Sequence, residues 1–294
     1  MHLSTAHLIF RTLAALILAA SLTAPVAAAP LKPFKDELFS YGTVIEAGDN
    51  GDYLVIDYDK MRDLHGRDEI PERKVTRAYV SLGVKSEQSF ETVNAGGRNV
   101  DVVRVGRERG AAFTVIFIHG RGGDRRLGAN DWIFGGNFNR LKNIAVANGG
   151  VYYSASVRSF DETGVTDVAA LIGYAQAQSP GRPVVLSCAS MGSIVCWGIA
   201  RDATASAALK GMMIMGGPSD PQFKDSAAYK RKLPVFFSHG GADNVYAAIG
   251  QVKFYRGLKA AGYPTRMVVF QTGSHGTPIR MTDWRDALNW IGLD

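Results

Sequence analysis

The sequence predicts an α/β protein with a doubly wound, mostly parallel sheet and antiparallel strands near its N-terminus. From about residue 113 onward, short apolar runs alternate with segments of helical spacing, which is typical of a parallel sheet covered by helices. Several of these runs show little polar alternation, as expected of strands covered on both faces. In residues 38–105, strand-like runs are instead separated by polar, glycine-rich turns. We expect this part to supply antiparallel edge strands.

The individual elements follow from these patterns in chain order. Strands are expected at 53–58, 77–82 and 99–105, and the charged stretch 57–74 is expected to be a helix or an exposed loop. Six further strands are expected at 113–118, 151–155, 183–187, 212–215, 235–238 and 266–270. Helical spacing predicts helices around 165–172, 245–255 and 284–291, the second stopped by Gly262 and Pro264. Since no repeat or Pro/Ser-rich linker divides the chain, one domain is the simpler interpretation.

The first 28 residues have the pattern of a secretory signal peptide. Arg11 is their one formal charge, and an apolar run over about 13–22 precedes small residues at 24–29. The run is shorter than the ~20 residues of a transmembrane helix. We therefore expect a signal peptide at 1–28 and one exported domain at 29–294, periplasmic or secreted, with no stable membrane insertion after cleavage. An uncleaved anchor is the alternative.

The composition is that of an ordinary folded protein. The 294 residues are 46% hydrophobic and 20% charged, which excludes disordered and collagen-like chains. The formal charge of +6 would suit a nucleic-acid or anionic-surface partner. The two cysteines, Cys188 and Cys196, are too few for a disulfide framework. They are expected to be small buried hydrophobes, with a bridge between them as the alternative.

A glycine-rich loop follows the strand expected at 113–118. Its sequence is Ile-His-Gly-Arg-Gly-Gly-Asp over 118–124. Glycines there allow backbone N–H groups to point at a ligand, either a phosphate or a developing oxyanion. A phosphate loop ends in Gly-Lys-Ser/Thr, whereas Arg125 and Arg126 stand here, so the loop does not match that motif.

A second motif lies between the strand at 183–187 and a helix expected to begin near Met191. Ser190 occupies this tight turn, where a serine side chain is presented above the sheet and near a helix N-terminus. A serine that merely caps the helix is the alternative. Such a turn needs small residues two positions on either side; Gly192 fits this need and Cys188 fits it less well.

Two further loops place an acid before a histidine. Asp243 follows the strand at 235–238, and His275 follows the strand at 266–270. A carboxylate can orient an imidazole, which then accepts a proton from a serine hydroxyl. Asp220 is the alternative acid, and Asp243 as a plain helix cap is the alternative role. The sequence shows no grouping with metal-ligand spacing.

Together these motifs resemble the α/β-hydrolases of the serine hydrolase superfamily, over about residues 113–293. The chain order Ser, Asp, His is the order of that family, and Arg158 resembles an arginine often found after its second parallel strand. The chain departs from the family at Cys188, where glycine is usual. The resemblance implies structural roles for His119 and His239 and the following site: Ser190 as nucleophile, His275 as base, Asp243 as orienting carboxylate, and the backbone N–H groups of Arg121 and Met191 as the oxyanion hole.

The resemblance also implies the activity. We expect a cofactor-free hydrolase of small-molecule carboxylic esters that acts through an acyl-enzyme. A peptidase, thioesterase or lactonase would use the same residues, and an inactive binding protein is the alternative from another class. Export and the three catalytic residue types argue against a nucleic-acid partner.

The surroundings of the site are expected to be open. Only about seventeen residues separate the strands on either side of 217–233, too few for a lid domain, and the loop 121–143 is the largest candidate for a pocket wall. Aromatic residues within it, Trp132, Phe134 and Phe138, are expected to line the pocket or pack the loop. Its basic residues either recognise a carboxylate or phosphate or form a solvated face: Arg121, Arg125, Arg126, Arg140 and Lys142.

Overall fold

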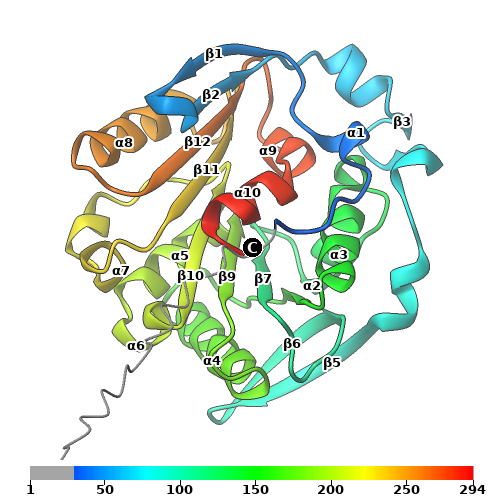
Figure 1. Ribbon diagram of the computed structural model, residues 1–294. Coiled ribbons are helices and arrows are strands. Elements are labelled where there is room, and N and C mark those ends of the chain that lie inside the picture. The colour runs from blue at the N-terminus through cyan, green and yellow to red at the C-terminus, as the bar shows by residue number, and fades with distance from the viewer. Residues whose placement is uncertain (1–29, 294) are drawn as a thin grey trace, which may run out of the picture.

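The computed structural model describes residues 30–293, which form a ten-stranded sheet flanked by helices (Figure 1). The predicted signal peptide at 1–28 lies outside the described residues. The strand order is β1-β2-β12-β11-β10-β9-β7-β8-β6-β5. The strands are β1 (Val44–Gly48), β2 (Tyr53–Ile56), β5 (Gln88–Ala95), β6 (Arg98–Val105), β7 (Thr114–Ile118), β8 (Val151–Ala155), β9 (Val184–Ala189), β10 (Leu209–Met215), β11 (Val235–Gly240) and β12 (Thr265–Phe270).

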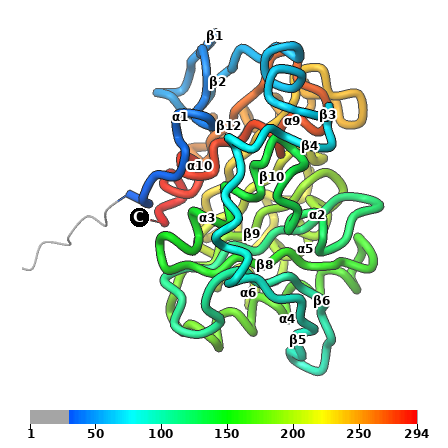
Figure 2. Tube along the Cα trace, turned by 90° about the vertical axis from the view of Figure 1, so that its right-hand side faces the viewer, coloured from blue at the N-terminus to red at the C-terminus, as the bar shows by residue number. Residues whose placement is uncertain are grey.

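The pairing confirms the predicted fold class. Strands β2, β12, β11, β10, β9, β7 and β8 form a continuous parallel series. The antiparallel pairs are β1 with β2 at one edge, and β6 with both β5 and β8 at the other. These two edges lie at opposite ends of the molecule in both views (Figures 1 and 2). All six strands expected between 113 and 270 are present, each within a few residues of the expected bounds.

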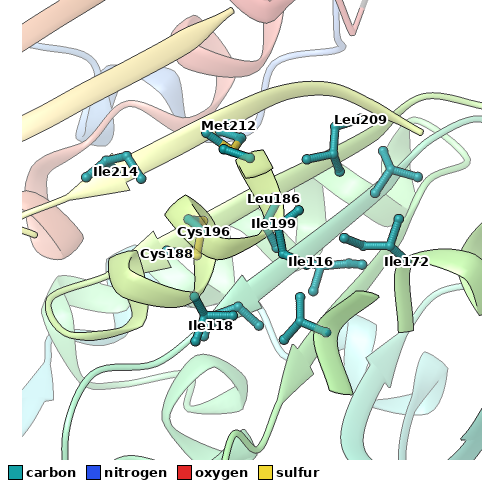
Figure 3. Packing of buried hydrophobic residues seen from close by; sticks show 14 of the residues in the cluster. Ile116, Ile118, Ile172, Leu186, Cys188, Cys196, Ile199, Leu209, Met212 and Ile214 are labelled. Atoms are coloured by element: carbon teal, nitrogen blue, oxygen red, sulfur yellow. A yellow bond between two sulfur atoms is a disulfide. The ribbon is translucent and has the colours of Figure 1, made fainter. Parts of the chain in front are cut away.

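Helices cover both faces of the sheet, which makes the fold doubly wound. The longer helices are α3 (Asn137–Ala147), α4 (Glu162–Gln178), α5 (Gly192–Arg201), α8 (Ala248–Ala260) and α10 (Trp284–Ile291). The shorter ones are α1 (Asp36–Phe39), α2 (Arg125–Ala129), α6 (Ala203–Ala207), α7 (Ala227–Lys230) and α9 (Thr277–Met281). Apolar residues of α4, α5 and α8 form one buried cluster with the sheet, part of which Figure 3 shows, and those of α3 and α10 form a second.

The N-terminal part differs most from the predictions. The stretch expected as a strand at 77–82 is a helical turn at Arg77–Tyr79 followed by extended chain. Its backbone is held by a side chain instead of a neighbouring strand: Ser81 donates its N–H to Asn139 Oδ1 at 2.8 Å, and Asn139 Nδ2 donates to the Ser81 carbonyl at 2.9 Å. Strand β5 was not expected, because few of its residues are buried and Phe90 is 56% exposed.

The charged stretch 57–74 is neither one helix nor one loop. It contains a helical turn at Met61–His65 and strand β3 (Asp68–Ile70), which pairs with β4 (Lys74–Val75) outside the main sheet. Arg280 of α9 forms a buried ion pair with Asp68, at 2.9 and 2.7 Å, that ties this segment to the body. No helix within residues 30–293 is long and apolar enough to cross a membrane.

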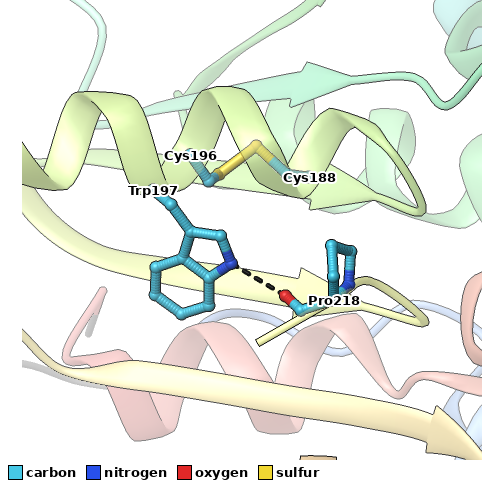
Figure 4. The surroundings of a disulfide bond; sticks show 4 residues. All are labelled: Cys188, Cys196, Trp197 and Pro218. Carbon is cyan, nitrogen blue, oxygen red and sulfur yellow. Dashed lines mark hydrogen bonds between the residues drawn. A yellow bond between two sulfur atoms is a disulfide. The ribbon is translucent and has the colours of Figure 1, made fainter. Parts of the chain in front are cut away.

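The two cysteines form a disulfide, which corrects the expectation of two free thiols. Cys188 lies in β9 and Cys196 in α5, and their Cα atoms are 6.2 Å apart, within the range a disulfide spans (Figure 4). The expected burial is correct, since both residues are fully buried. The chain reverses after β9 and lays α5 back along that strand, and this return brings the two sulfurs together.

Candidate active site

The predicted site residues meet at the carboxyl ends of the central strands, where ligands bind in open α/β sheets. Ser190 follows β9, Asp243 follows β11 and His275 follows β12. The loop after β7 also reaches this point, because a Cβ placed on Gly120 would lie only 2.8 Å from Ser190 Cβ. Four strand ends that are distant in sequence therefore converge on one serine.

Ser190 occupies a turn that few residues with side chains adopt. Its φ of 51° lies in the left-handed region, which is disfavoured for every residue except glycine. The turn is held by the Ser190 N–H, which donates to the Met215 carbonyl at 2.9 Å, and by the Ser193 N–H, which donates to the Ser190 carbonyl at 3.0 Å. Because the turn is sharp, α5 begins at Gly192 and Ser190 stands at its N-terminal end.

His275 lies between Ser190 and Asp243. Its Nε2 is 2.9 Å from Ser190 Oγ, and its Nδ1 is 2.8 Å from Asp243 Oδ2. An ionised carboxylate only accepts hydrogen bonds, so Nδ1 carries the proton and Nε2 faces the serine with its lone pair. The arrangement can move the serine proton to Nε2 while Asp243 stabilises the resulting imidazolium.

Asp243 is held as a fixed acceptor. Its side chain is fully buried, and its Oδ1 accepts the N–H groups of Val245 at 2.8 Å and Tyr246 at 3.1 Å. These bonds compensate the burial of its charge. The alternative acid, Asp220, instead forms an ion pair with Arg201 and caps a helical turn through the N–H of Gln222. The structure therefore brings Asp243, not Asp220, to His275.

The other two strand-end histidines are buried and hold loops. His119 donates from Nδ1 to the Gly120 carbonyl at 2.7 Å, and its Nε2 accepts the N–H of Val157 at 3.0 Å. His239 donates from Nε2 to the Tyr246 carbonyl at 2.7 Å. Burial lowers the pKa of both imidazoles below the ordinary 6.5, because it disfavours the charged form. Both imidazoles therefore stay neutral to lower pH than an exposed histidine does.

The two backbone groups expected to form an oxyanion hole flank the serine. Within residues 30–293, neither the Arg121 N–H nor the Met191 N–H donates to a protein acceptor. Both residues line the same cavity as Ser190. Two free amides beside a serine hydroxyl can stabilise negative charge that develops on a carbonyl oxygen.

A cavity of about 480 Å³ opens over Ser190 and His275. The segment between β7 and α3 supplies much of its wall, including Leu127 of α2 and Phe134. Several other lining residues were not indicated by any sequence pattern, and they come from three separate segments: Met215, Val245, Tyr246 and Ile279. The wall is mostly apolar, and none of the described residues that line it is acidic. No group of His, Cys, Asp and Glu within 30–293 is arranged to hold a metal ion.

The basic residues near this loop do not form one cluster. Arg140 is fully buried and pairs with Asp36 and Asp283, and Lys142 is fully buried and pairs with Asp131 at 2.6 Å. The other three basic residues, Arg121, Arg125 and Arg126, differ from one another in their surroundings. A guanidinium nitrogen of Arg125 lies 3.6 Å from a carboxylate oxygen of Asp101, and Arg126 pairs with Asp124. Arg121 alone among the five lines the cavity, and it has no ion-pair partner in the described part of the chain.

The expected aromatic wall is also divided. Phe134 lines the cavity, whereas Phe138 is buried against Phe117 at a ring distance of 4.7 Å. Trp132 lies away from the cavity and beneath the Lys74 ammonium.

Comparison with known proteins identifies the fold. No family model and no curated protein sequence matches the chain. A solved α/β serine hydrolase without a lid, from Xanthomonas campestris, is similar, with 19% identity, a TM-score of 0.51, and coverage of 70% of this chain and 94% of that one. The apo form of Thermogutta terrifontis esterase 2 has 14% identity, a TM-score of 0.52, and coverage of 74% and 98%. A Pyrococcus furiosus esterase has 13% identity, a TM-score of 0.51, and coverage of 70% and 93%.

These similarities, together with the strand order, define the class. The chain has the α/β-hydrolase fold, as its motifs predicted. Within the described residues, the segment between β10 and β11 holds only a helical turn (Pro221–Asp225) and α7, so it has no lid domain there.

Proposed function

We propose that the protein is a serine hydrolase that cleaves carboxylic esters through an acyl-enzyme on Ser190. The observation that carries this proposal is the continuous hydrogen-bond chain from Ser190 Oγ to His275 to Asp243, at 2.9 and 2.8 Å. Solved proteins that share the fold include a serine hydrolase and esterases, which favours ester chemistry.

Acylation follows from the geometry of these groups. Ser190 Oγ attacks the ester carbonyl carbon while His275 Nε2 takes the hydroxyl proton. The carbonyl oxygen becomes an oxyanion and accepts the N–H groups of Arg121 and Met191. The C–O bond to the alcohol then breaks, and the alcohol leaves with the proton from Nε2.

Deacylation repeats the sequence with water. His275 removes a proton from a water molecule, whose oxygen attacks the acyl carbon, and the proton returns to Ser190 Oγ as the carboxylic acid leaves. The apolar wall of Leu127, Phe134 and Ile279 favours an acyl or alcohol group without many polar atoms.

Covalent labelling tests the proposal. Wild-type protein treated with a fluorophosphonate should gain one phosphonyl group on Ser190, and the matched Ser190→Ala variant should gain none. Chromogenic esters of graded chain length, measured beside thioesters, lactones and aminoacyl amides, should give the highest kcat/KM on an ester. Folded wild-type protein that is not labelled would contradict the proposal and favour a binding protein. A Ser190→Ala variant that is labelled would contradict the role of Ser190 and indicate a different nucleophile.

We also propose that residues 1–28 direct export. The disulfide supports this, because disulfides persist mainly in oxidising compartments. Expression of the full chain in a bacterium should give an exported protein whose N-terminal residue, by mass spectrometry, is Ala29. Full-length protein retained in the cytoplasm would contradict the proposal.

A further inference from the structure

The disulfide lies at the one position where the nucleophile turn departs from the usual α/β-hydrolase pattern. Cys188 stands two residues before Ser190, at the position where glycine is usual, and it is bonded to Cys196 in α5. The bond, shown in Figure 4, joins residues eight apart in the sequence, and Ser190 lies between them in the chain.

The turn inside this loop is one that needs to be held. Ser190 has a left-handed φ of 51°, and such conformations persist in residues with side chains only where the surroundings enforce them. Two backbone hydrogen bonds, to Met215 and within the turn, provide part of the restraint. The remaining requirement is that α5 stay fixed relative to β9, since these elements leave the turn on either side.

The disulfide supplies that restraint because each of its two cysteines lies in a firmly packed element. Cys188 pairs in register with Ile118 of β7 and Ile214 of β10, so it is fixed on both sides within the sheet. Cys196 precedes Trp197, whose Nε1 donates to the Pro218 carbonyl at 2.8 Å and whose ring packs on Phe223 at 5.0 Å. Figure 4 shows the bond joining the strand and the helix beside this indole.

Burial indicates that the bond is permanent. Both cysteines are fully buried within an apolar cluster, so a dissolved reductant reaches the sulfurs only after the protein opens (Figure 3). This environment suits a structural restraint and does not suit a bond that cycles between redox states.

We propose that the Cys188–Cys196 disulfide is a positioning device for the nucleophile. It fixes α5 against β9 at the middle of the helix, and so keeps Ser190 Oγ within hydrogen-bond distance of His275 and the Met191 N–H beside it. The inference rests on the proposed function of Ser190. A positional error on the order of 1 Å costs roughly a hundredfold in rate, so loss of the bond should lower kcat about tenfold to a hundredfold.

The test separates the covalent link from the volume of its atoms. The Cys188→Ala/Cys196→Ala variant removes both, whereas Cys188→Ala/Cys196→Val restores apolar volume without the bond. Both should show lower kcat and slower single-turnover phosphonylation of Ser190, with KM changed much less. Leu209→Ala serves as the control for a loss of stability alone. Leu209 is 2% exposed and begins β10, at the end of that strand away from Ser190. It should lower the melting temperature while the folded protein keeps the wild-type kcat.

Each outcome decides the inference. Variants that lack the bond yet phosphonylate at the wild-type rate overturn the positioning role and leave the proposed function intact. A wild-type kcat in the Cys188→Ala/Cys196→Val variant also overturns the positioning role, because the apolar volume alone would then be enough to position Ser190. Wild-type protein that reacts with no phosphonate overturns both proposals. If neither variant folds, a thiol titration of active wild-type protein, unfolded in denaturant without reductant, decides: no free thiol supports the inference, and two free thiols in fully active protein overturn it.

Discussion

Gly192, the first residue of α5, is closely packed against the loop after β7 in the turn that carries Ser190. A Cβ placed there would lie 2.5 Å from the His119 carbonyl oxygen and 2.9 Å from the Ile118 carbonyl oxygen. Both are backbone atoms at the end of a central strand, so they cannot move aside as a flexible side chain can. Gly192→Ala must therefore separate the turn from the β7 loop by about 0.9 Å to reach an ordinary contact.

This displacement sets the expected magnitude. A shift on the order of 1 Å at the reacting groups costs roughly a hundredfold in rate, which is about 2.7 kcal/mol of transition-state free energy. Overpacking also lowers the free energy of unfolding by about 1–3 kcal/mol. We expect kcat/KM on the best ester to fall about a hundredfold, mostly through kcat, because the apolar cavity wall is unchanged.

The assay compares Gly192→Ala with a matched substitution in another helix. Gly173 lies inside α4, and a Cβ there would meet nothing within 4 Å. Gly173→Ala should keep the wild-type kcat/KM and raise the free energy of unfolding by roughly 0.5–1 kcal/mol. Steady-state kinetics and chemical denaturation measure both quantities. A Gly192→Ala enzyme within about twofold of wild-type kcat/KM would refute the reasoning from close packing.

Three further predictions concern the groups around the serine. Asp243→Asn should lower kcat about 10³- to 10⁴-fold, because the amide favours the wrong tautomer of His275; a loss below tenfold in steady-state assays would contradict the orienting role. Since burial lowers the pKa of His119 and His239, the unfolded chain binds protons below pH 6.5 that the folded chain does not. The contribution of these two neutral histidines to the free energy of unfolding is complete above that pH and is lost as the pH falls. The denaturant concentration at the unfolding midpoint should therefore decrease from pH 7.5 to pH 5. An unchanged or higher midpoint at pH 5 would contradict this assignment of the two histidines. Arg121→Gln should lower kcat/KM for a hemisuccinate ester about tenfold relative to kcat/KM for a neutral butyrate ester, because one charge-assisted hydrogen bond to the hemisuccinate carboxylate is lost. An unchanged ratio of the two values would show that this guanidinium does not face the substrate.

Much of the fold could be predicted because it depends on local patterns. Fully buried strands have continuous apolar sequences, and the runs at β7, β8 and β9 were visible for that reason. The edge strand β5 was missed because its buried positions are few. The stretch at 77–82 has a strand-like composition, but its backbone partner is the Asn139 side chain, 58 residues away from Ser81 in the sequence.

The candidate site was predictable in its residue types and order. Ser190, Asp243 and His275 each follow an apolar run, and carboxyl ends of parallel strands meet at one edge of a sheet. Two candidate acids remained in the sequence, because Asp220 also follows a strand. Only the tertiary structure distinguishes them, since it pairs Asp220 with Arg201 and places Asp243 Oδ2 at 2.8 Å from His275.

The sequence by itself determined the fold class, the parallel strands from β7 to β12 and the order in which the candidate site residues follow them, because each depends on patterns a few residues long. The tertiary structure decided which side chains contact one another. It buried Arg140 and Lys142 against acids from other segments, assembled the cavity wall from separate loops, and joined Cys188 to Cys196. These outcomes depend on distances between elements, and such distances are fixed only when both faces of the sheet are packed.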